Sequence, residues 1–190
     1  MGHAIVVAAA RAGKDAVYLD SGSNFSPRYM RALCSVDTVG TLKKVMVRPV
    51  LNSEDLESAF RDISAMPSVC LVVVDNLTGV MNMSSAPASK ERQRQLYSTL
   101  ETIRAATVSN RLHVVILDHS TTDWRTGEKR PIGGNVIEHA VDTVVSMGMI
   151  STMDHCVRVQ VERTPVAPNP GGVVIMVDHT GIRSIKSHRS

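Results

Sequence analysis

The sequence is poor in aromatic residues, in cysteine and in long apolar stretches, and each shortage excludes a class of protein. Aromatic residues make up only 3% of the chain, which argues against a surface built from several base-stacking platforms. Cys34, Cys70 and Cys156 are widely spaced and odd in number, as expected of reduced intracellular thiols. The longest apolar run, residues 4–10, is far shorter than the roughly 18 residues of a membrane helix. No basic stretch or cleavage site marks a secretory signal. We therefore expect a soluble, intracellular protein that makes no membrane contact.

Length, composition and charge set wider bounds. A chain of 190 residues, 43% hydrophobic and 21% charged, has the size and balance of one globular domain. We therefore expect a single domain over residues 1–190. The formal net charge of +3 permits nucleic-acid binding without requiring it, so any such surface depends on local clustering of basic residues.

Alternating strand-like and helical segments predict an α/β fold. Val69–Asp75 and Leu112–Asp118 are continuous apolar runs, typical of strands buried on both faces of a parallel sheet. We expect further strands at 16–20 and 45–49, and helices at 27–33, 53–66 and 89–108, the second of these capped by Ser53.

The last third of the chain has strand patterns without helices between them, at 141–149, 155–161 and 173–177. These strands should pair antiparallel. The polar stretches 81–90, 120–130 and 166–172 are predicted loops. The pattern thus predicts a mostly parallel sheet with helices on both faces and an antiparallel C-terminal edge.

Acidic or polar residues stand where three predicted strands end, at Asp20, Asp75 and the pair Asp118–His119. Ligands of open α/β sheets collect beyond these carboxyl ends. Asp75 follows four apolar residues, which is the Walker B arrangement, in which a carboxylate holds Mg²⁺ through water against nucleotide phosphates. The alternative is a buried strand that ends on a helix-capping aspartate.

The segment 130–140 reads RPIGGNVIEHA. Gly133 and Gly134, placed before a helix, would leave backbone N–H groups free to meet phosphate oxygens. A plain Gly-Gly turn before a helix is the alternative.

The order of these elements, together with the PIGGN-x-I-x-HA turn and the tail 158–182, resembles the RecA-type core of the RadA and Rad strand-exchange recombinases over nearly the whole chain. This resemblance implies a RecA-like P-loop ATPase core and a site for ATP and Mg²⁺. The residues it implies for that site are Asp75, Asp118, His119, Gly133 and Gly134.

The resemblance also implies two DNA-binding segments, one at 81–94 and one at 120–135. Basic side chains there could neutralise phosphates, and the only tryptophan could stack on a base. For any single basic residue, a merely solvated side chain is the alternative. The implied DNA-binding residues are Lys90, Arg92, Arg94, Trp124, Arg125, Lys129, Arg130 and Asn135.

Several features depart from the family pattern. The phosphate loop G-x-x-x-x-G-K-[ST] is missing from the sequence. The resemblance implies that the strand before it is missing too, so the core is expected to be N-terminally truncated. The family's Asp-Thr-Glu-Gly is replaced by Asp20-Ser-Gly22-Ser, and its Asn-Gln pair by Asp118-His119. A glycine cannot act as general base. The histidines show no metal-ligand spacing, so we predict no metal site built from histidine and cysteine.

These features lead to the hypothesis of a degenerate recombinase paralog that assists or caps a recombinase filament on single-stranded DNA. Hydrolysis by this chain alone is not expected, and ATP with Mg²⁺ would bind only at an interface with a partner, either a recombinase or another paralog. The alternatives are a fragment of an active DNA-dependent ATPase and a KaiC-like ATPase without a role in recombination. The resemblance implies the nucleus as the location, or the cytoplasm in an archaeal cell.

Overall fold

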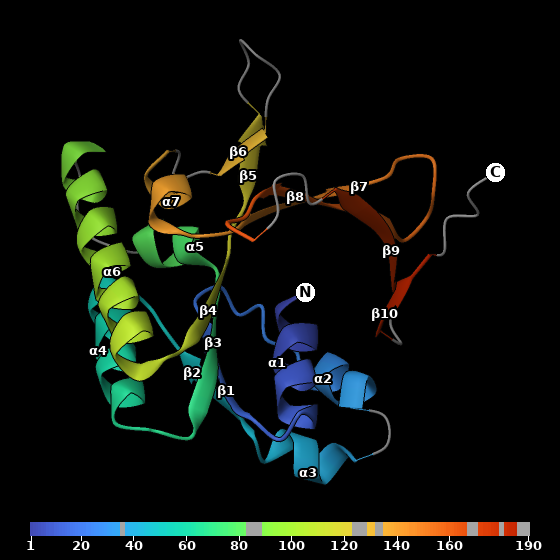
Figure 1. The fold of residues 1–190 in the computed structure, drawn as a ribbon, viewed down its shortest axis with the longest axis horizontal. Helices are drawn as coiled ribbons and strands as arrows, with labels where there is room; N and C mark the ends of the chain where they lie inside the picture. The colour runs from blue at the N-terminus through green and yellow to red at the C-terminus, as the bar shows by residue number, and fades with distance from the viewer. Residues whose placement is uncertain are drawn as a thin grey trace. The chain divides into compact units, whose positions relative to one another are not determined.

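A computed structural model describes residues 1–34, 37–82, 89–122, 129–131, 135–166, 171–178 and 181–185 of the chain. It divides into two compact units, Met1–Ala140 and Val141–Ser190 (Figure 1). No helix in these described ranges is long and apolar enough to cross a membrane.

The first unit is built on a parallel sheet of four strands. They are β1 (Asp15–Asp20), β2 (Val45–Pro49), β3 (Val69–Asp75) and β4 (His113–Leu117). Their order is β2-β1-β3-β4, and every pair is parallel. The predicted parallel sheet is therefore confirmed, with each strand within a residue or two of its expected range.

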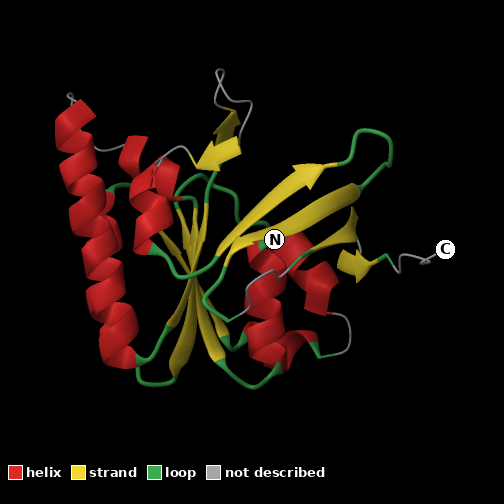
Figure 2. Cartoon of the chain, turned by 45° about the horizontal axis from the view of Figure 1, so that its top comes forward, coloured by secondary structure: helices red, strands yellow, loops and turns green. Residues whose placement is uncertain are grey.

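Helices cover both faces of this sheet, as predicted (Figure 2). One face carries α1 (Gly2–Arg11), α2 (Pro27–Cys34) and α3 (Thr38–Leu42), and the other carries α4 (Ser53–Ser64) and α6 (Ser89–Asn110). Two short helices, α5 (Leu77–Asn82) and α7 (Asn135–Ala140), complete the unit. Gly13 follows α1 with a φ of 79°, a backbone conformation that favours glycine where a helix ends.

Strand β3 separates two hydrophobic cores because successive side chains of a strand point to opposite faces. Val72 and Val74 belong to the core shared with α4 and α6, whereas Leu71 and Val73 belong to the core shared with α1 and α2. The prediction of a strand buried on both faces is confirmed for β3.

The same prediction is wrong for β4. Its residues Val114 to Leu117 are only half-buried and His113 is exposed, although their sequence is as apolar as that of β3. The physical reason is position: β4 ends the sheet, and β3 is its one strand neighbour among the described residues.

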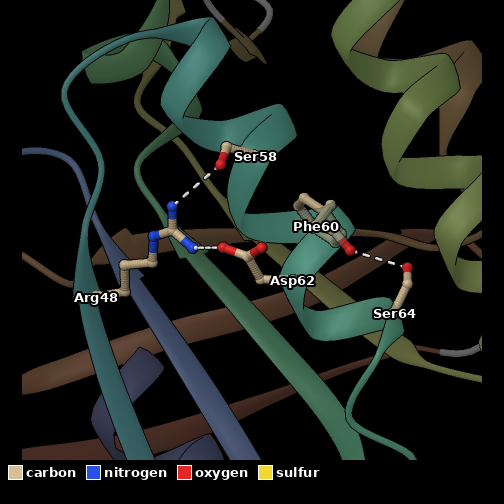
Figure 3. A network of polar contacts seen from close by, with 5 residues as sticks. All are labelled: Arg48, Ser58, Phe60, Asp62 and Ser64. Atoms are coloured by element: carbon tan, nitrogen blue, oxygen red, sulfur yellow. Dashed lines mark hydrogen bonds and ion pairs between the residues drawn. The ribbon is translucent and has the colours of Figure 1, made fainter.

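The cap of α4 also differs from the prediction. The N-cap is Asn52, whose side chain accepts a hydrogen bond from the Asp55 N–H at 2.9 Å, and the helix begins at Ser53. A polar contact then fixes α4 to β2, since the Arg48 guanidinium lies 2.5 Å from Asp62 (Figure 3).

Several short elements escaped the sequence analysis: α3, α5, a hairpin of β5 (Ser120–Thr122) and β6 (Lys129–Pro131), and β10 (Gly181–Ser184). The expected loop at 120–130 therefore contains strand at both ends. The β5–β6 ladder pairs Thr121 with Arg130 and Thr122 with Lys129. These two short strands read STT and KRP, so they lack the alternation of apolar and polar residues from which a strand is predicted.

The second unit is an antiparallel sheet, which confirms the predicted antiparallel pairing of the C-terminal strands. These strands form a sheet of their own, so the expectation of an antiparallel edge on the parallel sheet is wrong. It consists of β7 (Val144–Met149), β8 (Cys156–Arg163), β9 (Gly172–Asp178) and β10, in the order β10-β9-β8-β7. Every neighbouring pair is antiparallel. β8 and β9 pair antiparallel on either side of the loop expected at 166–172, of which residues 167–170 lie outside the described ranges.

Candidate functional site

The carboxyl ends of β1, β3 and β4 bring three aspartates to one edge of the parallel sheet. The strand register pairs Asp20 with Asp75 and Asp75 with Leu117, so Asp118 follows directly beyond β4. Asp75 and Asp118 are half-buried and His119 is exposed. Since ligands of parallel sheets bind at this edge, it is the candidate functional site.

The Asp20 side chain binds backbone groups of the turn that follows it. Its carboxylate accepts hydrogen bonds from the backbone N–H groups of Asn24 at 2.9 Å, Phe25 at 3.2 Å and Gly22 at 3.4 Å. Three backbone donors on one carboxylate fold residues 20–25 into a compact turn. Asp20 therefore shapes the rim of the site.

Asp75 is held from two sides. The Tyr18 hydroxyl donates to its Oδ2 and the Asn24 side-chain amide donates to its Oδ1 at 3.0 Å. Burial, and then the hydrogen bond to Asp75, raise the pKa of the Tyr18 phenol far above its ordinary value, so it remains a neutral donor. Asp75 does not cap the following helix, because the Gly79 N–H donates to Asn76 instead. The capping alternative for Asp75 is therefore wrong, and its role at a nucleotide site stays a prediction.

Asp118 is tied to the segment that follows β3. The Thr78 hydroxyl and the Thr78 N–H, the latter at 3.3 Å, donate to Asp118 Oδ1, as does the His119 N–H at 2.8 Å. Its other oxygen, Oδ2, is buried and has no hydrogen-bond partner among the described residues. The Asn76 side-chain nitrogen lies 3.2 Å from His119 Nε2 and so connects the ends of β3 and β4.

The structure therefore brings together Asp75, Asp118 and His119 of the predicted nucleotide residues. Gly133 and Gly134 lie outside the described residues. Tyr18, Asn24, Asn76 and Thr78 were not predicted. Asn76 and Thr78 stand one and three residues after Asp75 and were open to the same strand-end argument, whereas Tyr18 looks like an ordinary core residue.

The predicted DNA-binding residues are only partly described. Lys90, Arg92 and Arg94 are exposed at the start of α6, where Arg94 lies 3.7 Å from Glu91 in a solvated ion pair. Trp124 and Arg125 lie outside the described residues. The backbones of Lys129 and Arg130 form part of β6, and Asn135 begins α7.

The strand-end carboxylates suit a hydrated divalent cation. The described residues contain no group of three or more His, Cys, Asp or Glu placed to hold a metal ion together. Mg²⁺, however, keeps several of its waters and is commonly bound through one or two carboxylates. The unpartnered Oδ2 of Asp118 is an acceptor for such a water. The residues present therefore fit a magnesium nucleotide held through water.

Comparisons with known proteins agree with the fold. The model of the Rad51 family matches residues 5–184. A solved structure described as the crystal structure of the RadB recombinase matches with a TM-score of 0.77 at 13% sequence identity, covering 96% of this chain and 84% of that one. No curated protein sequence matches the chain.

Proposed function

The chain belongs to the Rad51 family, and from that premise we propose that it is a recombinase paralog with degenerate ATPase motifs, which assists or caps a recombinase filament on single-stranded DNA. Its fold is RecA-like, and family membership gives it a role in DNA recombination and repair. The paralog role is the proposal, and the environment of Gly22 carries it.

Gly22 stands at the position where the family carries its catalytic glutamate. A Cβ atom built on Gly22 would lie 3.0 Å from Asn24 Nδ2, so the space beside the glycine is filled by an amide. An amide neither gains nor loses a proton near neutral pH, so it cannot serve as a general base. This arrangement supports the proposal that the chain keeps nucleotide-binding groups at this edge of the sheet but lacks the group that activates water.

The proposal assigns the remaining residues of the edge to nucleotide binding. Asp75 and Asp118 would hold waters of the Mg²⁺ ion, and His119 would hydrogen-bond a phosphate oxygen. Backbone N–H groups at Gly133 and Gly134 would face the phosphates. Bound Mg²⁺–ATP would supply the positive charge and the phosphate oxygens that these groups recognise.

We further propose that a partner's phosphate loop holds most of the nucleotide, since the 190 residues of this sequence contain no G-x-x-x-x-G-K-[ST] motif. Half-buried apolar residues along β4 support this, because they would be covered by a strand added beside them. The opposite edge strand, β2, exposes Met46 and Val47, which supports association with a recombinase or another paralog through the edges of the core.

A fragment of an active DNA-dependent ATPase remains the second candidate, since the β4 edge supports it equally. The intact mass of the endogenous protein separates the two. A mass near 20.6 kDa favours the paralog, whereas a substantially larger mass favours the fragment.

The DNA role is tested by the salt dependence of binding to a labelled single-stranded oligonucleotide. Replacing Lys90, Arg92 and Arg94 together by alanine should lower the slope of log K against log salt by about 2, because each lost phosphate contact on a single strand contributes about 0.7. Arg104→Ala, a single change farther along the same helix, is the control and should leave the slope unchanged. An unchanged slope in the triple variant would exclude this surface from DNA binding.

A further inference from the structure

We propose that Tyr18 and Asn24 are positioning residues that fix the two carboxylate oxygens of Asp75, and that residue 22 is glycine because the Asn24 amide needs the space beside it. We call Tyr18, Asn24 and Asp75 the carboxylate clamp. The inference rests on the proposed function only in giving Asp75 a place at a nucleotide site.

Tyr18 is the rigid half of the clamp. It is fully buried in β1, and its ring is 5.1 Å from that of His3 and 5.3 Å from that of Phe25, measured between centroids. With the ring packed on these neighbours, the hydroxyl cannot swing away from Asp75 Oδ2, to which it donates. An oriented donor of this kind fixes one carboxylate oxygen at no further cost in side-chain entropy.

Asn24 is the second half of the clamp, and a hydrogen bond to Asp20 orients it. The side chain of Asn24 is exposed, so no hydrophobic packing orients it. Its backbone N–H instead donates to Asp20 Oδ1 at 2.9 Å, which points the residue back over the strand ends. Its amide then reaches Asp75 Oδ1 at 3.0 Å. The turn held by Asp20 therefore places the Asn24 side-chain amide against Asp75.

The Asn24 amide can occupy this position because residue 22 is a glycine and has no side chain. The three atoms nearest to a Cβ built on Gly22 all belong to the Asn24 side chain, at 3.0, 3.5 and 3.6 Å. A methyl group would push the amide by a few tenths of an ångström, and a larger side chain would displace it. A glutamate at position 22 is thus incompatible with the contact between Asn24 and Asp75.

A clamped carboxylate presents its remaining lone pairs in one fixed direction. Hydrogen bonds that orient a carboxylate from behind are known to set its affinity for a metal ion or for the waters around it. The clamp would therefore decide how well Asp75 holds hydrated Mg²⁺, even though neither Tyr18 nor Asn24 touches the ion.

The geometry of the clamp is tested by NMR on the isotope-labelled full chain. Asp75→Asn should shift both Asn24 side-chain amide protons and speed the solvent exchange of the Tyr18 hydroxyl proton. Gly22→Ala should shift the Asn24 amide protons and leave the Tyr18 signal in place. The clamp is refuted if Asp75→Asn leaves the Asn24 amide and the Tyr18 hydroxyl unchanged.

Its effect on the cation is tested with Mn²⁺ and ATP, followed by water-proton relaxation. Tyr18→Phe and Asn24→Ala should each weaken Mn²⁺–ATP binding by about tenfold, the usual scale for losing such a supporting hydrogen bond. Tyr29→Phe, in the same aromatic cluster, and Asn110→Ala, at the far end of α6, are the matched controls and should bind as the unmodified protein does. Unchanged affinity in both clamp variants would overturn the positioning role. Failure of the unmodified protein to bind Mn²⁺–ATP would instead count against the proposed nucleotide site, while the NMR result would still decide the clamp.

Discussion

At the scale of single residues, the contacts of the buried His3 side chain require that its imidazole be neutral. Its Nε2 accepts a hydrogen bond from the Ser26 N–H at 2.8 Å, and its ring stacks on Phe25 with centroids 5.2 Å apart. Both nitrogens of an imidazolium are donors, so protonation removes this acceptor. Burial, and then the nearby amino terminus of Met1, lower the pKa of His3 against the opposing pull of Asp75 and Asp20.

The lowered pKa predicts a loss of stability in mild acid. The unfolded chain takes up the proton near pH 6.5, before the folded chain does, so the free energy of unfolding should fall as pH drops from there through the folded-state pKa. Urea denaturation at a series of pH values measures this. His3→Gln, which keeps an acceptor but cannot titrate, should lose the pH dependence in that window. An equal loss in both proteins would assign the effect to other groups.

Alanine substitutions at two glycines should affect stability to different extents, because the surroundings of the two residues differ. A Cβ on Gly2 would lie 2.9 Å from both the Tyr18 ring and a methyl of Leu117 in the core, so Gly2→Ala should destabilise by about 1–3 kcal/mol. Gly22→Ala meets only the exposed Asn24 side chain and should change stability by less than about 0.5 kcal/mol. Chemical denaturation of the two variants provides the comparison, and equal losses would contradict the contacts described for Gly2.

At the scale of secondary-structure elements, the Asn52 side chain caps the start of α4. Asn52→Ala removes the acceptor of the Asp55 N–H and should lower the free energy of unfolding by about 1 kcal/mol. Asn52→Ser, which restores a capping oxygen, should recover most of this loss. If the serine variant is as unstable as the alanine variant, the cap is not the cause.

The inner strand β3 and the edge strand β4 should respond differently to the same truncation. Val72 in β3 is fully buried, whereas Val114 in β4 is half-buried. Val72→Ala should therefore cost about 2 kcal/mol or more, and Val114→Ala clearly less, because less surface is returned to water and the edge can relax. Thermal or urea denaturation decides this, and equal costs would mean that β4 is as well covered as β3.

At the scale of the whole molecule, the sequence predicts the frame better than the site. The parallel sheet follows from apolar runs such as Val69–Asp75, and the strand-end rule finds Asp75 and Asp118. The contacts that give Asp75 its surroundings come from Tyr18 and Asn24, which are 57 and 51 residues away in sequence. No periodicity or motif encodes such distances, because they depend on which strands become neighbours. The half-burial of β4 escapes for the same reason.

The shared position of β3 has a consequence for the order in which the first unit opens. Its alternate side chains complete two separate cores, and its backbone bonds to β1 on one side and to β4 on the other. No partial opening can release this strand while either helical layer stays in place. The amide hydrogens of Val72 to Val74 should therefore exchange with solvent only when the whole unit unfolds, so their exchange rates report its global stability directly.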